Sequence, residues 1–110
     1  MWKMSTDLSR MKLSGPTMGT RWYAELGVPA GTDTTALETA LAGAVAQVDA
    51  QMSTWKPDSD LMRLNRAPVG GWVDIPRDLM RVLARGLEIG RASDGAFDIG
   101  LGDLVTAWGF

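Results

Sequence analysis

The sequence contains no cysteine and no histidine among its 110 residues. The absence of cysteine excludes disulfide bridges and thiolate metal sites, and the absence of histidine removes the commonest general base and metal ligand. Any metal ion bound here would need oxygen ligands, which suit hard ions such as magnesium. No apolar run approaches the roughly 18 to 20 residues of a membrane-spanning helix, and the first twelve residues lack the apolar region of a signal peptide.

The chain also carries little net charge. Its formal net charge is −2 and its pI is about 4.9, whereas a nucleic-acid partner would require a basic face, so such a partner is not expected. Hydrophobic residues make up 45% and charged residues 22% of the chain, as in ordinary globular proteins. This length predicts a single domain over residues 1–110 with a modest core, and residues 1–10 are expected to be flexible.

Two strand-like segments surround a turn signal near the start of the chain. Residues 11–14 and 21–28 are rich in strand formers, and the stretch GPTMGT at 15–20 contains proline and two glycines. These segments therefore form either a hairpin or one bulged strand.

A helix is predicted from about residue 35 to Met52. Apolar residues recur there every three or four positions, at Leu37, Leu41, Val45, Val48 and Met52. The opposite, polar face carries Thr39, Gln47 and Asp49. The helix begins either with a capping box of Thr35 and Glu38 or with a cap at Thr34 or Asp33.

In the second half of the chain, the sequence pattern predicts two short elements, a longer helix and a final helical segment. A short helix over 60–67 is capped by Ser59 or Asp58, a strand covers 72–75, and a longer helix begins at Pro76 and ends near Ala92. The last segment becomes helical from about Gly102. The buried stripe of the longer helix is predicted to contain Leu79, Val82, Leu83, Leu87 and Ile89. This order predicts an α+β fold, with a small, largely antiparallel sheet and two main helices packed on it, rather than a doubly wound sheet.

The closing stretch SDGAFDIGLGDLVTAWGF (93–110) has two interpretations. Glycines let backbone N–H groups approach a phosphate. However, Gly100-Leu101-Gly102 is followed by Val105 where the dinucleotide-binding motif requires Gly or Ala. Turns and helix ends are the simpler explanation of these glycines.

Three acids of the same stretch, Asp94, Asp98 and Asp103, are close enough in sequence to bind a metal ion or orient a hydroxyl group. Their spacing does not match a calcium-binding loop. Asp94 is explained as a turn residue and Asp103 as a helix cap. Asp98 stands between two apolar residues, so we expect it to be half-buried and to have a polar partner.

Two large apolar residues stand outside any core pattern. Met18 lies in the tight turn TMGT, where a gap-filling core methionine is not expected. Trp55 follows the predicted helix end, and its ring either caps that end or offers a flat surface to a ligand ring. The remaining tryptophans that we assign to the core are Trp22, Trp72 and Trp108.

Three stretches together resemble the N-terminal signatures of the FAD:protein FMN transferases, the ApbE family. They are GPTMGTRWYAEL (15–26), VDAQMSTWKPDSDLMRLN (48–65) and SDGAFDIGLGDLVTAWGF (93–110), in the family's order and spacing. The segment MSTWKPDSDLMRLN is a specific match. The resemblance covers residues 15–110 but not a whole family member, so we expect this chain to be the N-terminal part of a longer protein.

The resemblance implies a Mg²⁺-dependent phosphoryl transfer. FMN passes from FAD to a Thr or Ser hydroxyl of a target protein, and AMP is released. The cofactor-binding residues implied for this chain are Met18, Trp55, Asn65, Ala96, Phe97 and Asp98. The family's magnesium ligands are expected downstream of Phe110, so no metal ligand is assigned here and this chain alone is expected to be inactive. One departure is Asp98-Ile99, where many relatives carry Asp-Pro, which changes backbone freedom more than chemistry.

Other interpretations remain open. The chain is alternatively a non-catalytic flavin-binding or interaction module, or a truncated domain that self-associates through apolar residues near LVTAWGF. The family resemblance implies a periplasmic or membrane-anchored lipoprotein, but this chain has no signal peptide and no lipid-bearing cysteine.

Overall fold

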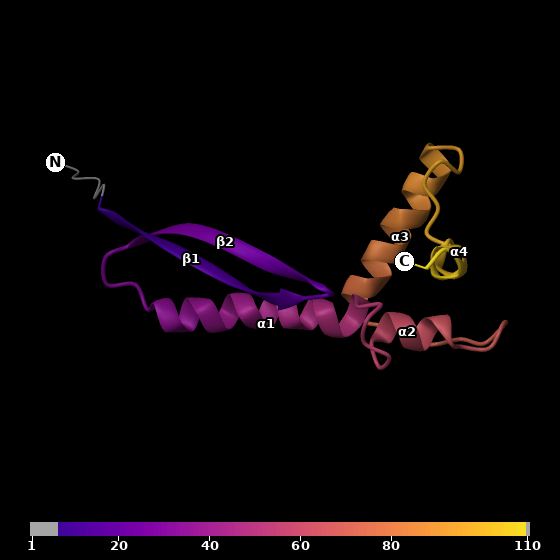
Figure 1. Cartoon of the computed structure of the whole chain (residues 1–110), viewed down its shortest axis with the longest axis horizontal. Coiled ribbons are helices and arrows are strands. Elements are labelled where there is room, and N and C mark those ends of the chain that lie inside the picture. The colour runs from indigo at the N-terminus through magenta and orange to yellow at the C-terminus, as the bar shows by residue number, and fades with distance from the viewer. Residues whose placement is uncertain (1–6, 110) are drawn as a thin grey trace. The chain divides into compact units, whose positions relative to one another are not determined.

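The computed structural model describes residues 7–109 (Figure 1). Its elements are β1 (Leu8–Thr17), β2 (Thr20–Pro29), α1 (Thr34–Met52), α2 (Asp60–Asn65), α3 (Arg77–Ala92) and α4 (Gly102–Ala107). The chain divides into two compact units, one ending at Asn65 and the other beginning at Arg66. The first unit holds the hairpin, α1 and α2, and the second holds α3 and α4. The single domain expected over 1–110 stays a prediction.

β1 and β2 form an antiparallel hairpin, which decides between the two arrangements predicted for this region. The strands pair from Leu8 opposite Pro29 to Thr17 opposite Thr20, so that two residues remain at the tip. Met18 and Gly19 have φ values of 43° and 72°, the left-handed conformation that a tight two-residue hairpin turn requires at both positions.

The hairpin begins earlier than the sequence predicts. β1 includes residues 8–10, so the expectation of a flexible segment over residues 1–10 is wrong for these three. Their backbone is fixed by pairing with β2, which the polar composition of the segment does not reveal. Residues 1–6 and Phe110 lie outside the described residues.

α1 confirms the predicted helix and lies beside the hairpin, in contact with β1 (Figure 1). Its N-cap is Asp33, whose carboxylate accepts a hydrogen bond from Ala36 N at 3.0 Å, so the capping box of Thr35 and Glu38 is wrong. Four members of the apolar stripe are half-buried, while Val48 is exposed. Asp49, assigned to the polar face, is instead buried.

α2 is the short helix predicted after the interruption of helical structure at Pro57, although it ends at Asn65 rather than at residue 67. The Ser59 hydroxyl accepts a hydrogen bond from Met62 N at 3.1 Å. Ser59 rather than Asp58 therefore caps this helix.

In the second unit, α3 begins after Pro76 and ends at Ala92, as predicted. Only Leu79 of its expected stripe is buried, and Leu83 is half-buried. The assignment is wrong for the other three members, which are exposed: Val82, Leu87 and Ile89. Gly86 is buried instead, because Ile99 of the following loop lies against it.

The predicted strand over 72–75 is absent. Among residues 7–109 the sheet contains only β1 and β2, which pair with one another. An alternating sequence becomes a strand only when a neighbour takes its backbone hydrogen bonds, and this segment has no neighbouring strand.

The core assignments of the tryptophans are largely wrong. Trp22 is half-buried, but Trp72 is fully exposed and Trp108 is 77% exposed. Among the described residues, Val28 and Leu79 are the only buried hydrophobic side chains. The fold class is nevertheless the predicted one, since an antiparallel sheet is combined with two long helices.

No helix within residues 7–109 is both long enough and apolar enough to cross a membrane.

Leu79→Ala should lower the free energy of unfolding by about 2–5 kcal/mol, because Leu79 is 1% exposed and its removal leaves a cavity. Leu87→Ala is the matched control on the same helix, because Leu87 is 52% exposed. Urea unfolding followed by circular dichroism measures both. Equal losses in the two variants would contradict this description of the core.

Candidate functional site

The first unit contains a hollow at the tip of the hairpin, with a volume of about 530 Å³. We call it the hairpin-tip hollow. Its lining residues come from the hairpin turn, the last turn of α1 and the loop that follows: Pro16, Thr17, Met18, Gly19, Thr20, Asp49, Ser53, Trp55 and Lys56. A hollow of this size is in the range of small-molecule sites.

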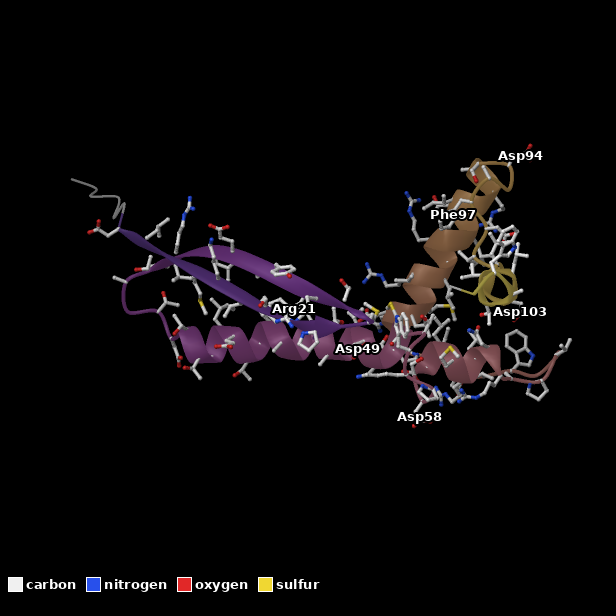
Figure 2. The ribbon with its side chains drawn as sticks, in the orientation of Figure 1. Arg21, Asp49, Asp58, Asp94, Phe97 and Asp103 are labelled. Carbon is white, nitrogen blue, oxygen red and sulfur yellow. The ribbon has the colours of Figure 1, made fainter. Side chains whose placement is uncertain are left out.

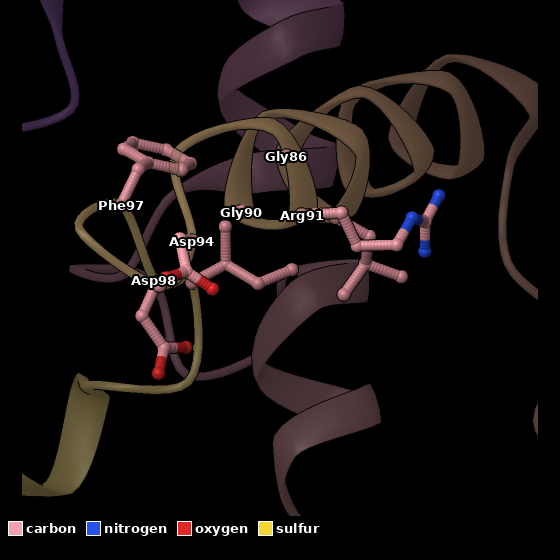
Figure 3. A pocket seen from close by; sticks show the side chains of 9 residues that line it. Gly86, Gly90, Arg91, Asp94, Phe97 and Asp98 are labelled. Atoms are coloured by element: carbon pink, nitrogen blue, oxygen red, sulfur yellow. The ribbon is translucent and has the colours of Figure 1, made fainter.

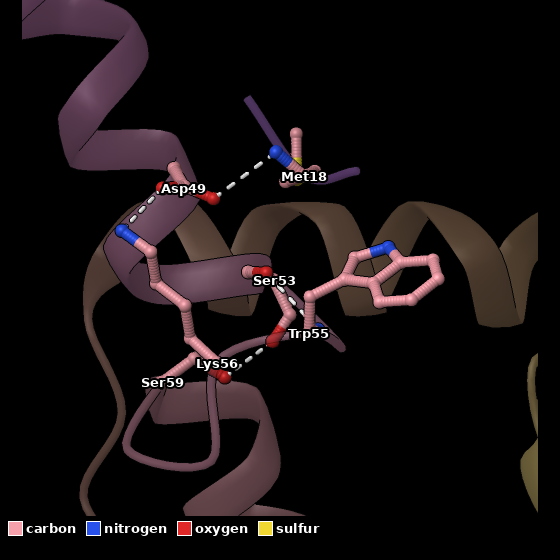
Figure 4. A network of polar contacts seen from close by, with 6 residues as sticks. All are labelled: Met18, Asp49, Ser53, Trp55, Lys56 and Ser59. Carbon is pink, nitrogen blue, oxygen red and sulfur yellow. Dashed lines mark hydrogen bonds and ion pairs between the residues drawn. The ribbon is translucent and has the colours of Figure 1, made fainter. Parts of the chain in front are cut away.

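Asp49 connects the three parts of this hollow (Figure 4). One carboxylate oxygen accepts a hydrogen bond from Met18 N at 3.3 Å, and the other lies 2.5 Å from Lys56 Nζ. The Asp49 side chain is 13% exposed. A nearly buried carboxylate requires such partners, because removing an unpaired charge from water is unfavourable.

The surroundings of Asp49 lower its pKa from the ordinary value. The hydrogen bond and the positive charge of Lys56 are the main cause, and Met18 N–H and the Ser53 hydroxyl act in the same direction. Burial opposes this shift, because it disfavours the charged form. Asp49 is therefore ionised at neutral pH.

The loop after α1 is held by two buried serines. Ser59 Oγ donates a hydrogen bond to the Ser53 carbonyl at 2.6 Å, and Ser53 Oγ accepts one from Trp55 N at 3.1 Å. Both serine side chains are almost fully buried. The Trp55 backbone is therefore anchored while its side chain stays free, with 72% of the residue exposed.

The Trp55 indole lies against the backbone of Gly19. A Cβ atom at Gly19 would lie 2.6 Å from Trp55 Nε1 and 2.7 Å from Cε2, closer than any real side chain permits. A glycine is therefore favoured at this position, both by the left-handed backbone and by the indole ring. The contact brings the hairpin tip and the aromatic ring into one surface.

Two features of the hairpin tip are energetically unfavourable for the residues concerned. Met18 adopts a left-handed conformation that side-chain-bearing residues seldom occupy. Thr17 Oγ1 is buried and has no hydrogen-bond partner among the described residues. Backbone strain and unsatisfied polar groups are concentrated at binding sites in many proteins.

The second unit contains its own hollow, of about 440 Å³, between the C-terminal end of α3 and the loop that follows (Figure 3). We call it the helix-end hollow. It is lined by Gly86, Leu87, Gly90, Arg91, Asp94, Gly95, Phe97, Asp98 and Ile99.

The loop of the helix-end hollow is shaped by its own hydrogen bonds. Ser93 Oγ accepts a hydrogen bond from Phe97 N at 3.0 Å, and Gly95 N donates to the Gly90 carbonyl at 2.9 Å. Asp94 has a φ of 52°, in agreement with the predicted turn. Asp98 is exposed rather than half-buried, and its carboxylate accepts a hydrogen bond from Gly100 N at 2.7 Å.

The structure thus brings some of the predicted site residues together. Met18 and Trp55 share the hairpin-tip hollow, and Phe97 and Asp98 share the helix-end hollow. Asn65 lines neither hollow, and its side-chain amide donates to Met62 Sδ at 3.9 Å. Ala96 also lines neither, and its backbone N–H donates to the Ser93 carbonyl. The binding roles of all six residues stay predictions.

Sequence reasoning missed four residues of the hairpin-tip hollow and its supporting loop: Asp49, Ser53, Lys56 and Ser59. One signal was available, because Asp49 is an acid in the last turn of α1, where the helix dipole disfavours negative charge. Ser59 was noted only as a helix cap. For Ser53 and Lys56, no local pattern indicated these contacts.

The acids near the C-terminus do not form a metal site. Among residues 7–109 no group of three or more His, Cys, Asp or Glu side chains is placed to hold a metal ion. Asp94 and Asp103 lie at separate places in the second unit (Figure 2), and Asp103 makes no side-chain cap on α4, contrary to expectation. No catalytic step through a metal ion is therefore assigned to these residues.

Comparison with known proteins places this geometry in context. Residues 18–110 match the model of the ApbE family. The chain is 33% identical over 105 residues to the FAD:protein FMN transferase of Haemophilus influenzae and 39% identical over 101 residues to that of Klebsiella pneumoniae. These alignments cover 91% and 89% of this chain but only 30% and 28% of the relatives.

Solved structures of the same family also match this chain. The flavin transferase ApbE from Vibrio cholerae superposes with a TM-score of 0.87 at 31% identity, and the apo flavinyl transferase ApbE from Pseudomonas stutzeri with 0.82 at 32%. Each match covers 94% of this chain and 34% of the other.

Gly19→Ala should destabilise the chain more than Gly31→Ala does. Both glycines have positive φ, so each alanine carries backbone strain of about 1–2 kcal/mol. Only Gly19 faces the Trp55 ring, while nothing lies within 4 Å of a Cβ at Gly31. The collision should add about 1–3 kcal/mol and change the Trp55 fluorescence. Equal unfolding free energies for the two variants would contradict the contact.

The contribution of Asp49 to stability should depend on pH. Its pKa is lower in the folded than in the unfolded chain. The contribution is therefore complete above the ordinary carboxyl pKa of about 3.9 and is lost as the pH falls through the folded-state value. The stability difference between the wild type and Asp49→Asn should stay constant from neutral pH down to about pH 5 and shrink below about pH 3.9. Urea unfolding across this range measures it, and a difference that shrinks already near neutrality would refute the assignment.

Proposed function

The chain belongs to the ApbE family, and on that premise we propose that it supplies the flavin-binding part of an FAD:protein FMN transferase. It spans about a third of the solved family structures that it matches. The proposal therefore concerns the complete transferase, and this chain contributes the hairpin-tip hollow as a seat for the flavin. The chain alone is expected to lack transferase activity.

The reaction proposed for the complete enzyme is a phosphoryl transfer. The hydroxyl oxygen of a Thr or Ser in the acceptor protein bonds to the phosphorus on the FMN side of the FAD pyrophosphate. The bridging P–O bond breaks, AMP leaves with the bridging oxygen, and the hydroxyl proton is released. Catalysis of such a step depends on positioning and on neutralising the phosphate charge, which divalent ions provide. The Mg²⁺ requirement is part of the proposal, as is an extracytoplasmic location.

The observation that carries the proposal is the juxtaposition of Met18 and Trp55. They are 37 positions apart in the sequence (55 − 18), yet both line the hairpin-tip hollow. A flat, exposed indole beside a thioether offers a polarisable surface to an aromatic ring, and aromatic stacking contributes about 0.5–1.5 kcal/mol beyond burial. The Thr17 hydroxyl and the Lys56 ammonium at the same hollow are polar groups suited to ring heteroatoms.

The role of the helix-end hollow is a separate part of the proposal. Phe97 and Asp98 line it, and we assign them contacts with the flavin nucleotide. The contacts assigned to Asn65 and Ala96 rest on the family resemblance alone.

Titration of the chain with FAD, with and without Mg²⁺, tests the seat. Trp55→Ala should raise the dissociation constant about tenfold, the equivalent of roughly 1.4 kcal/mol, because the stacking surface is removed. The readouts are flavin fluorescence and tryptophan quenching.

Trp72→Ala is the control, because it also removes an exposed tryptophan but one that does not line the hollow. FAD affinities that are equal in the two variants would reject the hairpin-tip hollow as a flavin seat. Absence of binding to the wild type up to millimolar FAD would reject a seat that is preformed in this chain alone.

A further inference from the structure

We infer that Asp49 is a positioning residue of the hairpin-tip hollow, which fixes Met18 and Trp55 in one arrangement through its two carboxylate oxygens. The identity of the ligand rests on the proposed function. The positioning of Met18 and Trp55 is argued from the contacts of Asp49 and its neighbours and does not depend on which ligand binds.

Asp49 accepts a hydrogen bond from a backbone N–H group that is not paired within the hairpin. In a two-residue hairpin turn the N–H of the first turn residue points away from the strand ladder. Here that group is Met18 N–H, and it donates to Asp49 Oδ1 at 3.3 Å across 31 positions of sequence. The last turn of α1 therefore holds the hairpin tip at its left-handed residue.

The second oxygen of Asp49 holds the other side of the hollow. Lys56 Nζ lies 2.5 Å from Oδ2, and Lys56 directly follows Trp55 in the chain. Ser53 fixes Trp55 N from the preceding side, at 3.1 Å. The backbone of Trp55 is thus held between a hydrogen bond and the ion pair of the next residue (Figure 4). Its indole lies against Gly19.

Local structure gives no reason for an acid at this position. The last turn of α1 contains no basic residue, and a negative charge there interacts unfavourably with the helix dipole. The carboxylate is also mostly removed from water. A residue that departs from local preference in this way is expected where its distant contacts serve a function.

The test uses the whole chain labelled with ¹⁵N and compares Asp49→Ala with Glu38→Ala. Glu38 is an exposed acid on the same helix and does not line the hollow. The first measurement, without flavin, is hydrogen exchange of the Met18 amide together with the resonance of the Trp55 indole N–H. The second is the dissociation constant for FAD.

Asp49→Ala should speed exchange of the Met18 amide about tenfold, move the Trp55 indole resonance and raise the FAD dissociation constant about tenfold, the effect of one lost hydrogen bond to a charged group. Glu38→Ala should change none of these. Asp49→Asn retains an acceptor for Met18 N–H and should restore most of the exchange protection. Lys56→Met should leave Met18 protected but move the indole resonance.

The outcomes separate this inference from the proposed function. Wild-type exchange at Met18 and an unmoved indole resonance in Asp49→Ala would overturn the positioning role, whatever FAD does. If Asp49→Ala does not fold, an indole resonance of Trp55 that does not move in Lys56→Met would overturn it. Absence of FAD binding to the wild type would reject a flavin seat preformed in this chain alone, while altered Met18 and Trp55 signals in Asp49→Ala would still support the positioning role.

Discussion

The carboxylate of Asp49 is the contact on which the candidate site of the first unit depends. It joins the hairpin tip to the loop after α1 through Met18 N–H and the Lys56 ammonium. Without it, the two sides of the hollow would be related by the packing of α1 on β1 and by the contact of the Trp55 indole with Gly19. Few buried hydrophobic side chains are present among the described residues, and none of them lines the hairpin-tip hollow.

In the loop after α1, different residues hold the backbone and offer an exposed aromatic surface. Ser53 and Ser59 are buried and hydrogen-bonded to the loop backbone, whereas the neighbouring Trp55 side chain is largely exposed. A fixed backbone with a free aromatic face loses little conformational freedom on binding a ligand ring, and such preorganisation favours affinity. The left-handed turn residue Met18 and the unsatisfied Thr17 hydroxyl line the same hollow.

Many apolar side chains remain exposed in the second unit, including Phe97, Leu104 and Trp108. Binary patterning alone assigned Trp108 and most of the α3 stripe to a core. An apolar pattern predicts that a side chain prefers to be buried, but it does not identify the element that the side chain packs against. For the same reason the alternating segment at 72–75 did not become a strand, since the described residues offer it no partner strand.

The sequence by itself determined the family, the extents of α1 and α3 and the turn at Asp94, because each depends on residues close together along the chain. It left open whether residues 11–28 form a hairpin or one bulged strand, and the structure shows the hairpin. The structure was needed to show that Asp33, among rivals of similar propensity, caps α1. Only the tertiary structure decided that Asp49 is buried. The partner of Asp49 on the hairpin is 31 positions away. Whether two such groups meet depends on chain closure and on the packing of α1 against β1, and local propensities contain no information about either.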